Sequence, residues 1–380
     1  MKQGLSLSAC AQEVARQASA KRDFKCPSGR LAIERLPEPM TSPEGFRMDY
    51  GLVMDKVGSF PMRRLMHQQV AERVKIPWPY YERLMSEPAA PAACLPGRPL
   101  PAWSVLGENV NYWLHKQDEM RLVRTLDGQA RAYLGDRYRP LDNFDLFKAV
   151  APILMGEHAR GMRVESIMVT ETRFYIKAFS ERITGQVKVG DIVQAGVSIQ
   201  NSEVGHSTIE VAPAFFKLSC LNGAIVEDQS LKRRHVGRGS NGDDEGVSEL
   251  YSDRTRMADD DAFWRKVVDV ARAAFDEARF EKLLEKMRAA NDHQIPRGGA
   301  TLQEITEVMV SRYGMSGTEG EILLLNLIEG RDMSQYGLMN AITRTAQEEE
   351  ISYDRATDLE KLGGQILELS PSEWSELVAA

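Results

Sequence analysis

The 380-residue chain has only four cysteines, and none of them forms a CxxC pair. Cys10, Cys26, Cys94 and Cys220 are widely scattered, and cysteine and histidine never combine at the spacing of a zinc site. A chain of this length can bury a core without disulfide bonds. We therefore expect free thiols, a reducing cytoplasmic setting and no bound metal.

Long apolar runs and phosphate-binding motifs are lacking as well. Runs such as Ile322–Leu325 are far shorter than the ~20 residues that cross a bilayer. The N-terminal segment does not resemble a secretory signal, because Ser and Gln interrupt its apolar residues. No GxxxxGK[ST], no GxGxxG opening a helix, no GxSxG and no HExxH occurs. These absences argue against membrane association, nucleotide-driven chemistry and a nucleotide cofactor.

The patterns that are present predict an α+β fold, with a mostly antiparallel sheet, flanking helices and an all-helical C-terminal region. Residues 120–226 alternate as ββαββββ, and Asp127-Gly128 is a strong hairpin signal between the first two strands. Beyond a polar break at residues 239–246, apolar spacing predicts one long helix from Phe263 to Met287. Shorter helices follow at 301–313, 318–329, 334–348 and 353–365, and Thr318-x-x-Glu321 is the expected capping box.

We predict three regions that differ in charge: a mixed helical region at 1–119, an α+β core with a basic face at 120–240, and an acidic helical domain at 241–380. The net charge of −7 is uneven. Residues 241–380 hold 15 basic and 29 acidic residues, which leaves 33 basic and 26 acidic residues in 1–240. A positive body beside an acidic region is typical of proteins that handle polyanions, although domains also differ in charge for no functional reason.

Two basic segments predict nucleic-acid contact, with a solvated basic face as the alternative. Guanidinium groups bind phosphates through paired hydrogen bonds, and aromatic rings stack on unpaired bases. In an extended strand, Arg137 and Arg139 would lie on one side and Tyr138 on the other, unless the backbone turns at Pro140. The predicted residues are Arg131, Arg137, Tyr138, Arg139, Lys232, Arg233, Arg234, His235 and Arg238.

Two polar segments, Asn201-Ser202-Glu203 and Asn222-Gly223, are predicted to form tight turns, because Asn and Gly tolerate left-handed backbone angles. A catalytic alternative uses the same region. Asp191, Glu203, His206 and His235 would then bind a metal or act as acid and base groups of a hydrolase or nuclease. A thiolate pair of Cys220 with His235 is a further option, although a single Cys after an apolar strand is usually a buried small residue.

Five separated blocks of the sequence resemble, in order, a family of phage- and plasmid-encoded proteins of unknown function (DUF 932). The resemblance extends from about Leu31 to Trp374. It implies a mobile-element origin and makes residues 136–140, 201–203, 222–223 and 234–235 family-pattern positions. The blocks are HQQVAERVKIPWPYYERLM, YLGDRYRPLDNFDLFKAVAPIL, SIQNSEVG with CLNGAIV and RRHVG, YGLMNAITRTAQ, and SYDRATDLEKLGGQIL.

A further similarity is architectural. Hairpins that flank helices, together with a basic first domain, resemble single-strand annealing proteins of recombination systems, which hold DNA in a cationic groove without hydrolysing nucleotide. No sequence motif of those proteins occurs in this chain. The leading hypothesis is an oligomeric, non-enzymatic protein that binds single-stranded DNA. The alternatives are the metal-dependent nuclease or hydrolase above, and an inhibitor that binds a host protein through its acidic helical domain.

Overall fold

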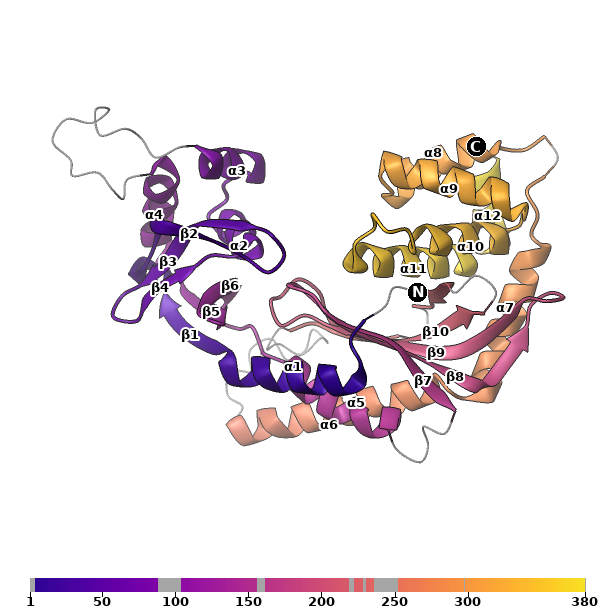
Figure 1. Ribbon diagram of the computed structural model, residues 1–380, viewed down its shortest axis with the longest axis horizontal. Helices are drawn as coiled ribbons and strands as arrows, with labels where there is room; N and C mark the ends of the chain where they lie inside the picture. The colour runs from indigo at the N-terminus through magenta and orange to yellow at the C-terminus, as the bar shows by residue number, and fades with distance from the viewer. Residues whose placement is uncertain are drawn as a thin grey trace.

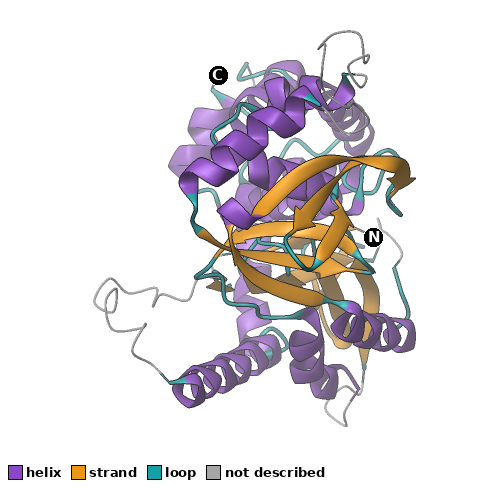
Figure 2. Cartoon of the chain, turned by 90° about the vertical axis from the view of Figure 1, so that its left-hand side faces the viewer, coloured by secondary structure: helices purple, strands orange, loops and turns teal. Residues whose placement is uncertain are grey.

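The structure is a computed structural model that describes residues 4–87, 104–155, 161–218, 222–227, 230–235, 252–296 and 298–379. Figure 1 shows an N-terminal lobe, a long central sheet, and a lobe of C-terminal helices that lies above the other end of this sheet. Three helices lie beneath the sheet: α1 (Leu7–Ala20), α5 (Asn143–Met155) and α6 (Asp253–Ala273). In Figure 2 the strands are seen between these two helical layers.

The N-terminal lobe contains two small antiparallel sheets, with strand orders β1-β5-β6 and β2-β3-β4. The Asp127-Gly128 turn between β5 and β6 has φ angles of 52° and 73°, as a type I′ hairpin requires, so the predicted hairpin is confirmed. The elements are β1 (Arg22–Pro27), β2 (Leu31–Thr41), β3 (Arg47–Met54), β4 (Gly58–Pro61), α2 (Arg64–Arg73), α3 (Trp78–Ser86), α4 (Val105–Gln117), β5 (Met120–Leu126) and β6 (Gln129–Gly135).

The central sheet has the order β11-β10-β9-β8-β7, and β12 also pairs with β10. Every pairing is antiparallel. Strand β9 is almost entirely buried, because helices cover both faces of the sheet. The strands are β7 (Met162–Val169), β8 (Phe174–Gln186), β9 (Ile192–Asn201), β10 (Ile209–Lys217), β11 (Asn222–Ile225) and β12 (Leu231–Arg233).

The C-terminal region is helical, as predicted, but two details differ. The single helix expected from Phe263 to Met287 is in fact two, because Asp276 caps a new helix by accepting a 2.9 Å hydrogen bond from the Arg279 N–H. The capping box also lies two residues earlier, at Ser316 and Glu319. The helices are α7 (Glu277–Asp292), α8 (Leu302–Tyr313), α9 (Gly317–Gly330), α10 (Gln335–Thr345), α11 (Tyr353–Glu368) and α12 (Pro371–Val378).

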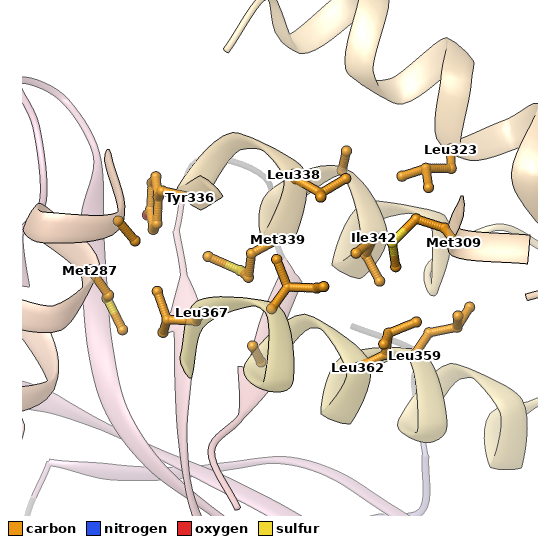
Figure 3. Close-up of a cluster of buried hydrophobic side chains, with 14 of the residues drawn as sticks. Met287, Met309, Leu323, Tyr336, Leu338, Met339, Ile342, Leu359, Leu362 and Leu367 are labelled. Carbon is orange, nitrogen blue, oxygen red and sulfur yellow. The ribbon is translucent and has the colours of Figure 1, made fainter. Parts of the chain in front are cut away.

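The largest apolar core joins these helices to the central sheet. Figure 3 shows Tyr336, Met339 and Ile342 of α10 facing Leu359, Leu362 and Leu367 of α11, with Met287 of α7 at one end. Sheet residues such as Val193 and Phe215 belong to the same cluster. Close approach is possible because Gly364 lies against the backbone of Ile225, where a Cβ atom would be only 1.9 Å from the carbonyl oxygen. The C-terminal lobe is therefore packed firmly onto the sheet.

The fold class is α+β with antiparallel sheets and an all-helical C-terminal region. The predicted boundaries after residues 119 and 240 stay predictions. Strand β1 pairs with β5 across the first of them, and α6 shares an apolar cluster with α1 and α5. Within the described residues, no helix is both long and apolar enough to span a bilayer.

Candidate functional site

A groove of about 910 Å³ lies where the N-terminal lobe meets the central sheet. Its walls come from the end of α2, the segment that leads into β5, the end of β6, the turn after β9, and the segment after β12. The lining residues are Arg73, Glu119, Met120, Arg121, Leu134, Gly135, Asp136, Arg137, Tyr138, Gly205, His206, Ser207, Thr208, Arg234 and His235.

Four arginines line this groove against two carboxylates, Glu119 and Asp136. Three of them, Arg73, Arg137 and Arg234, are exposed. The fourth, Arg121, is buried, pairs with Glu119 and lies 5.7 Å from the centre of the Tyr133 ring. The groove therefore has an excess of positive charge that suits an anionic ligand. Arg73 and Arg121 are not among the predicted residues, because neither belongs to the two basic segments.

The groove brings the two predicted basic segments together. The rings of Tyr138 and His235 stack with centroids 5.2 Å apart and planes 12° from parallel. The Arg139 N–H donates to the His235 carbonyl oxygen at 3.1 Å, and the Tyr138 hydroxyl donates to the Ser202 carbonyl oxygen at 3.1 Å. The backbone turns immediately after β6, where the Tyr138 N–H binds the Gly135 carbonyl oxygen, so Arg137, Tyr138 and Arg139 do not continue β6 as an extended strand.

His235 is neutral near pH 7. Burial lowers its pKa to about 4, and this outweighs the opposite effect of its contact with the Arg139 backbone. The positive charge of the groove therefore comes from its arginines. Because Tyr138 and His235 stack on each other, one face of each ring is already covered and is closed to a nucleic-acid base.

Four other predicted cations are bound to carboxylates of the same chain. Arg131 pairs with Glu203 at 2.6 Å, and Lys232 pairs with Glu227 at 2.9 Å and Glu210 at 3.1 Å. Arg139 and Arg233 pair with carboxylates of α6, described below. Arg137, Tyr138, Arg234 and His235 line the groove, whereas Arg238 lies outside the described residues, as does Cys220.

The Asn201-Ser202-Glu203 segment is only partly a turn, because Asn201 ends β9, the turn begins at Glu203, and the positive φ belongs to Gly205. The polar atoms of the segment are used inside the protein. The Glu203 carboxylate accepts from Arg131 and, at 2.8 Å, from the Asn143 N–H at the start of α5. Arg124 donates to the Glu203 carbonyl oxygen at 2.8 Å and to Asp142 at 2.8 Å. We call the four side chains of Arg124, Arg131, Asp142 and Glu203 the ionic hub. They connect β5, β6, α5 and the turn after β9.

The hub weakens the catalytic alternative. The Glu203 carboxylate, which would bind a metal or act as an acid or base, is already hydrogen-bonded to Arg131 and to the Asn143 backbone amide. Asp191 precedes β9 and Glu203 follows it, so a whole strand, about 30 Å long at roughly 3.3 Å per residue, separates them. Asp191 pairs instead with Lys217 at 2.8 Å. His206 does line the groove, and its pKa is lowered by burial and by Arg173. Within the described residues, no three His, Cys, Asp or Glu side chains are grouped so that they could hold a metal.

Asn222 and Gly223 correct the prediction of a second turn, since both belong to strand β11. The Asn222 side chain donates to the Thr343 hydroxyl at 2.7 Å and to the Asn340 carbonyl oxygen at 3.2 Å. Its amide thus ties the edge of the sheet to α10. This family-pattern position is structural and lies apart from the groove.

The family assignment rests on a match to the family model described as "Domain of unknown function (DUF932)", which covers residues 132–362. This is more than half of the chain, so the protein belongs to this family. The matched region includes Arg137, Arg234 and α6, whereas Arg73 and Arg121 precede it. No curated protein and no solved structure matches the chain.

Proposed function

We propose that this protein binds single-stranded DNA in the groove, as a non-enzymatic component of a phage or plasmid recombination system. The observation that carries the proposal is the convergence of three exposed arginines, Arg73, Arg137 and Arg234, from distant parts of the chain on one groove. Nucleic acids carry phosphodiester groups at regular intervals along an extended ligand. Arginines spaced along one groove are suited to several such groups at once.

The groove also has room for part of an extended ligand. A volume of about 910 Å³ is near the upper end of pockets that enclose small molecules, which reach about 1,000 Å³. The groove also places aromatic rings beside its basic side chains, as single-strand binding channels do, although the stacking of Tyr138 on His235 leaves the arginines as the main contacts of this proposal. The mobile-element context is implied by the family resemblance, and oligomer formation remains part of the hypothesis.

The structure narrows the set of residues that we assign to this function. Arg137 and Arg234 are the best candidates for direct phosphate contact, because both are exposed in the groove and both are predicted from the sequence. Arg73 joins them. Arg131 does not belong to the set, since it is buried against Glu203 and is part of the ionic hub.

The test is a titration of a labelled single-stranded oligonucleotide at several salt concentrations. The double variant Arg137→Gln with Arg234→Gln should bind roughly tenfold more weakly or worse. The slope of log K against log salt should fall by about 0.7 for each phosphate that the variant no longer binds. A matched control, Arg312→Gln with Arg344→Gln, removes two exposed arginines from the C-terminal lobe and should bind like the wild type.

Three results would overturn the proposal. The first is no binding by the wild type at low salt, and the second is a salt response that is flat. The third is equal loss of affinity in the groove variant and the control, which would assign binding to net charge alone. Gel analysis of the same samples with added Mg²⁺ or Mn²⁺ also matters, because cleavage of the oligonucleotide would replace the non-enzymatic proposal with the nuclease alternative.

A further inference from the structure

Two arginines beside the groove converge on one carboxylate oxygen. Oδ2 of Asp259, in α6, accepts from Arg139 Nη1 at 3.1 Å and from Arg233 Nη2 at 2.5 Å. The other amino group of Arg139 is 2.8 Å from Asp260. Two guanidinium groups that share one anionic oxygen have the geometry with which proteins bind phosphate. Here the oxygen comes from the protein itself.

Each arginine of this pair is next in sequence to a residue that lines the groove. Arg139 follows Tyr138, and its N–H binds the His235 carbonyl oxygen. Arg233 precedes Arg234, which lines the groove. The Asp259 carboxylate is therefore bound by the immediate sequence neighbours of two residues that line the groove.

The start of α6 is held mainly by polar contacts. Farther along, Phe263, Val267 and Ala271 are buried in the apolar cluster beneath the sheet. In contrast, the side chains described between Ser252 and Ala262 are exposed, apart from that of Asp260, which is half-buried. The Arg233 guanidinium also lies 4.6 Å from the centre of the Phe263 ring, which fixes this arginine even when its carboxylate partner is exchanged.

The ion pairs of Asp259 are exposed enough to be exchanged. Its side chain is 56% exposed, and ion pairs in contact with water contribute little to stability. Burial favours the neutral carboxylic acid, but the hydrogen bond and charge of Arg233, with those of Arg139, lower the pKa of Asp259 below its ordinary value. The carboxylate is thus ionised near pH 7 and competes with any incoming anion.

We propose that Arg139 and Arg233 form a second phosphate subsite next to the groove, and that Asp259 occupies it in the free protein as an intramolecular competitor. This inference rests on the proposed function, since the phosphate would belong to the DNA strand bound in the groove. Displacement of Asp259 by a phosphodiester exchanges one singly charged anion for another. The displacement adds two arginine–phosphate interactions to those made in the groove.

The experiment compares Asp259→Asn with Asp261→Asn, using the same labelled oligonucleotide. Both variants remove one negative charge from the same helical turn. Asp261 is exposed, and the structure gives it no ion pair to Arg139 or Arg233. Asp259→Asn should bind roughly three- to tenfold more tightly than the wild type, and its salt slope should steepen by about 0.7, for the one phosphate that the two arginines would hold. Asp261→Asn should stay within twofold of the wild type.

Further variants separate the possible outcomes. Adding Arg139→Gln and Arg233→Gln to Asp259→Asn should abolish the gain and return the slope to the wild-type value. Equal gains in Asp259→Asn and Asp261→Asn, or no gain in either, would overturn the subsite. If either outcome is found while the Arg137→Gln, Arg234→Gln variant still loses affinity, the groove remains the DNA-binding site and only the second subsite is rejected. Failure of the wild type to bind would instead reject the proposed function itself.

Discussion

The ionic hub and the arginine pair at α6 are built from the same residue types, yet their surroundings differ. In the hub, the side chain of Arg124 is fully buried and that of Glu203 is 5% exposed. At α6, Asp259 is 56% exposed and its partners Arg139 and Arg233 are partly exposed. The second group is much more exposed to water than the first, so the two sets of ion pairs have different roles.

Burial makes the hub a fixed junction. Removing a charge from water costs free energy, and ion pairs and hydrogen bonds offset this cost only where every partner is in place. Burial alone would lower the pKa of Arg124, but Asp142 and Asp23 raise it above its ordinary value, so the arginine is charged and fully committed. The contacts of the hub join β1, β5, α5 and the turn after β9. Exposure leaves the pairs at α6 free to exchange partners, which a binding site requires.

The largest predicted effect follows from breaking the hub. Arg124→Met removes one charge and takes away the hydrogen bonds that Arg124 donates to Asp23, Asp142 and the Glu203 carbonyl oxygen, and among the described residues only Lys21 then remains paired with Asp142. The free energy of unfolding should therefore fall by about 3–5 kcal/mol. Equilibrium denaturation in urea measures this value. The turn after β9 should also loosen, which hydrogen exchange of residues 202–206 reports.

A matched control shows whether burial is the cause. Arg344→Met breaks an ion pair with Glu329 whose side chains are 45% and 60% exposed. This variant should cost less than about 1 kcal/mol. Equal losses in the two variants would mean that burial does not distinguish these ion pairs, and the contrast between the hub and α6 would fail.

The sequence predicted the elements of the fold better than the partners of their side chains. The Asp127-Gly128 hairpin could be predicted because both residues tolerate positive φ and the flanking strands alternate. The capping box was shifted because SGTEGE contains two overlapping signatures, and tertiary contact decides between them: Arg355 binds Glu319 at 2.7 Å and holds it in the box. Local rules do not include such a distant partner.

The same reason limits the prediction of the site. Arg137, Tyr138, Arg234 and His235 were found because they stand in dense basic segments. The pairing of Arg131 with Glu203 spans 72 residues, and that of Arg139 with Asp259 spans 120. Composition shows that these cations exist. Only the folded chain shows which of them are already neutralised.

A second prediction concerns a buried group that, unlike those of the hub, has no opposite charge beside it. His67 is buried among aromatic rings and its Nδ1 is 2.9 Å from the Tyr81 hydroxyl. Burial lowers its pKa to about 3. Below about pH 6.5, His67 is protonated in the unfolded chain but stays neutral in the folded chain. The free energy of unfolding therefore decreases as the pH falls below 6.5. From pH 6.5 to 4.5 this group should cost about 2–3 kcal/mol.

The measurement is urea denaturation of wild type and His67→Gln across this pH range. The variant should lose about 2–3 kcal/mol less than the wild type on acidification, because Gln does not titrate. Tyr81→Phe removes the hydrogen bond and keeps the buried ring, so its pH dependence should match that of the wild type. Parallel curves for His67→Gln and the wild type would show that a buried group without a charged partner is not penalised here.

The smallest predicted effect lies at α6. Asp259→Asn removes the anion shared by Arg139 and Arg233, yet both arginines remain in contact with water, and Arg139 keeps Asp260. The free energy of unfolding should therefore change by less than about 1 kcal/mol. Urea denaturation at pH 7 shows whether Asp259 forms a permanent structural ion pair or one that a phosphate can replace. A loss of about 3 kcal/mol, like that expected for Arg124→Met, would make Asp259 part of the permanent structure, and an exchangeable phosphate subsite would then have no physical basis.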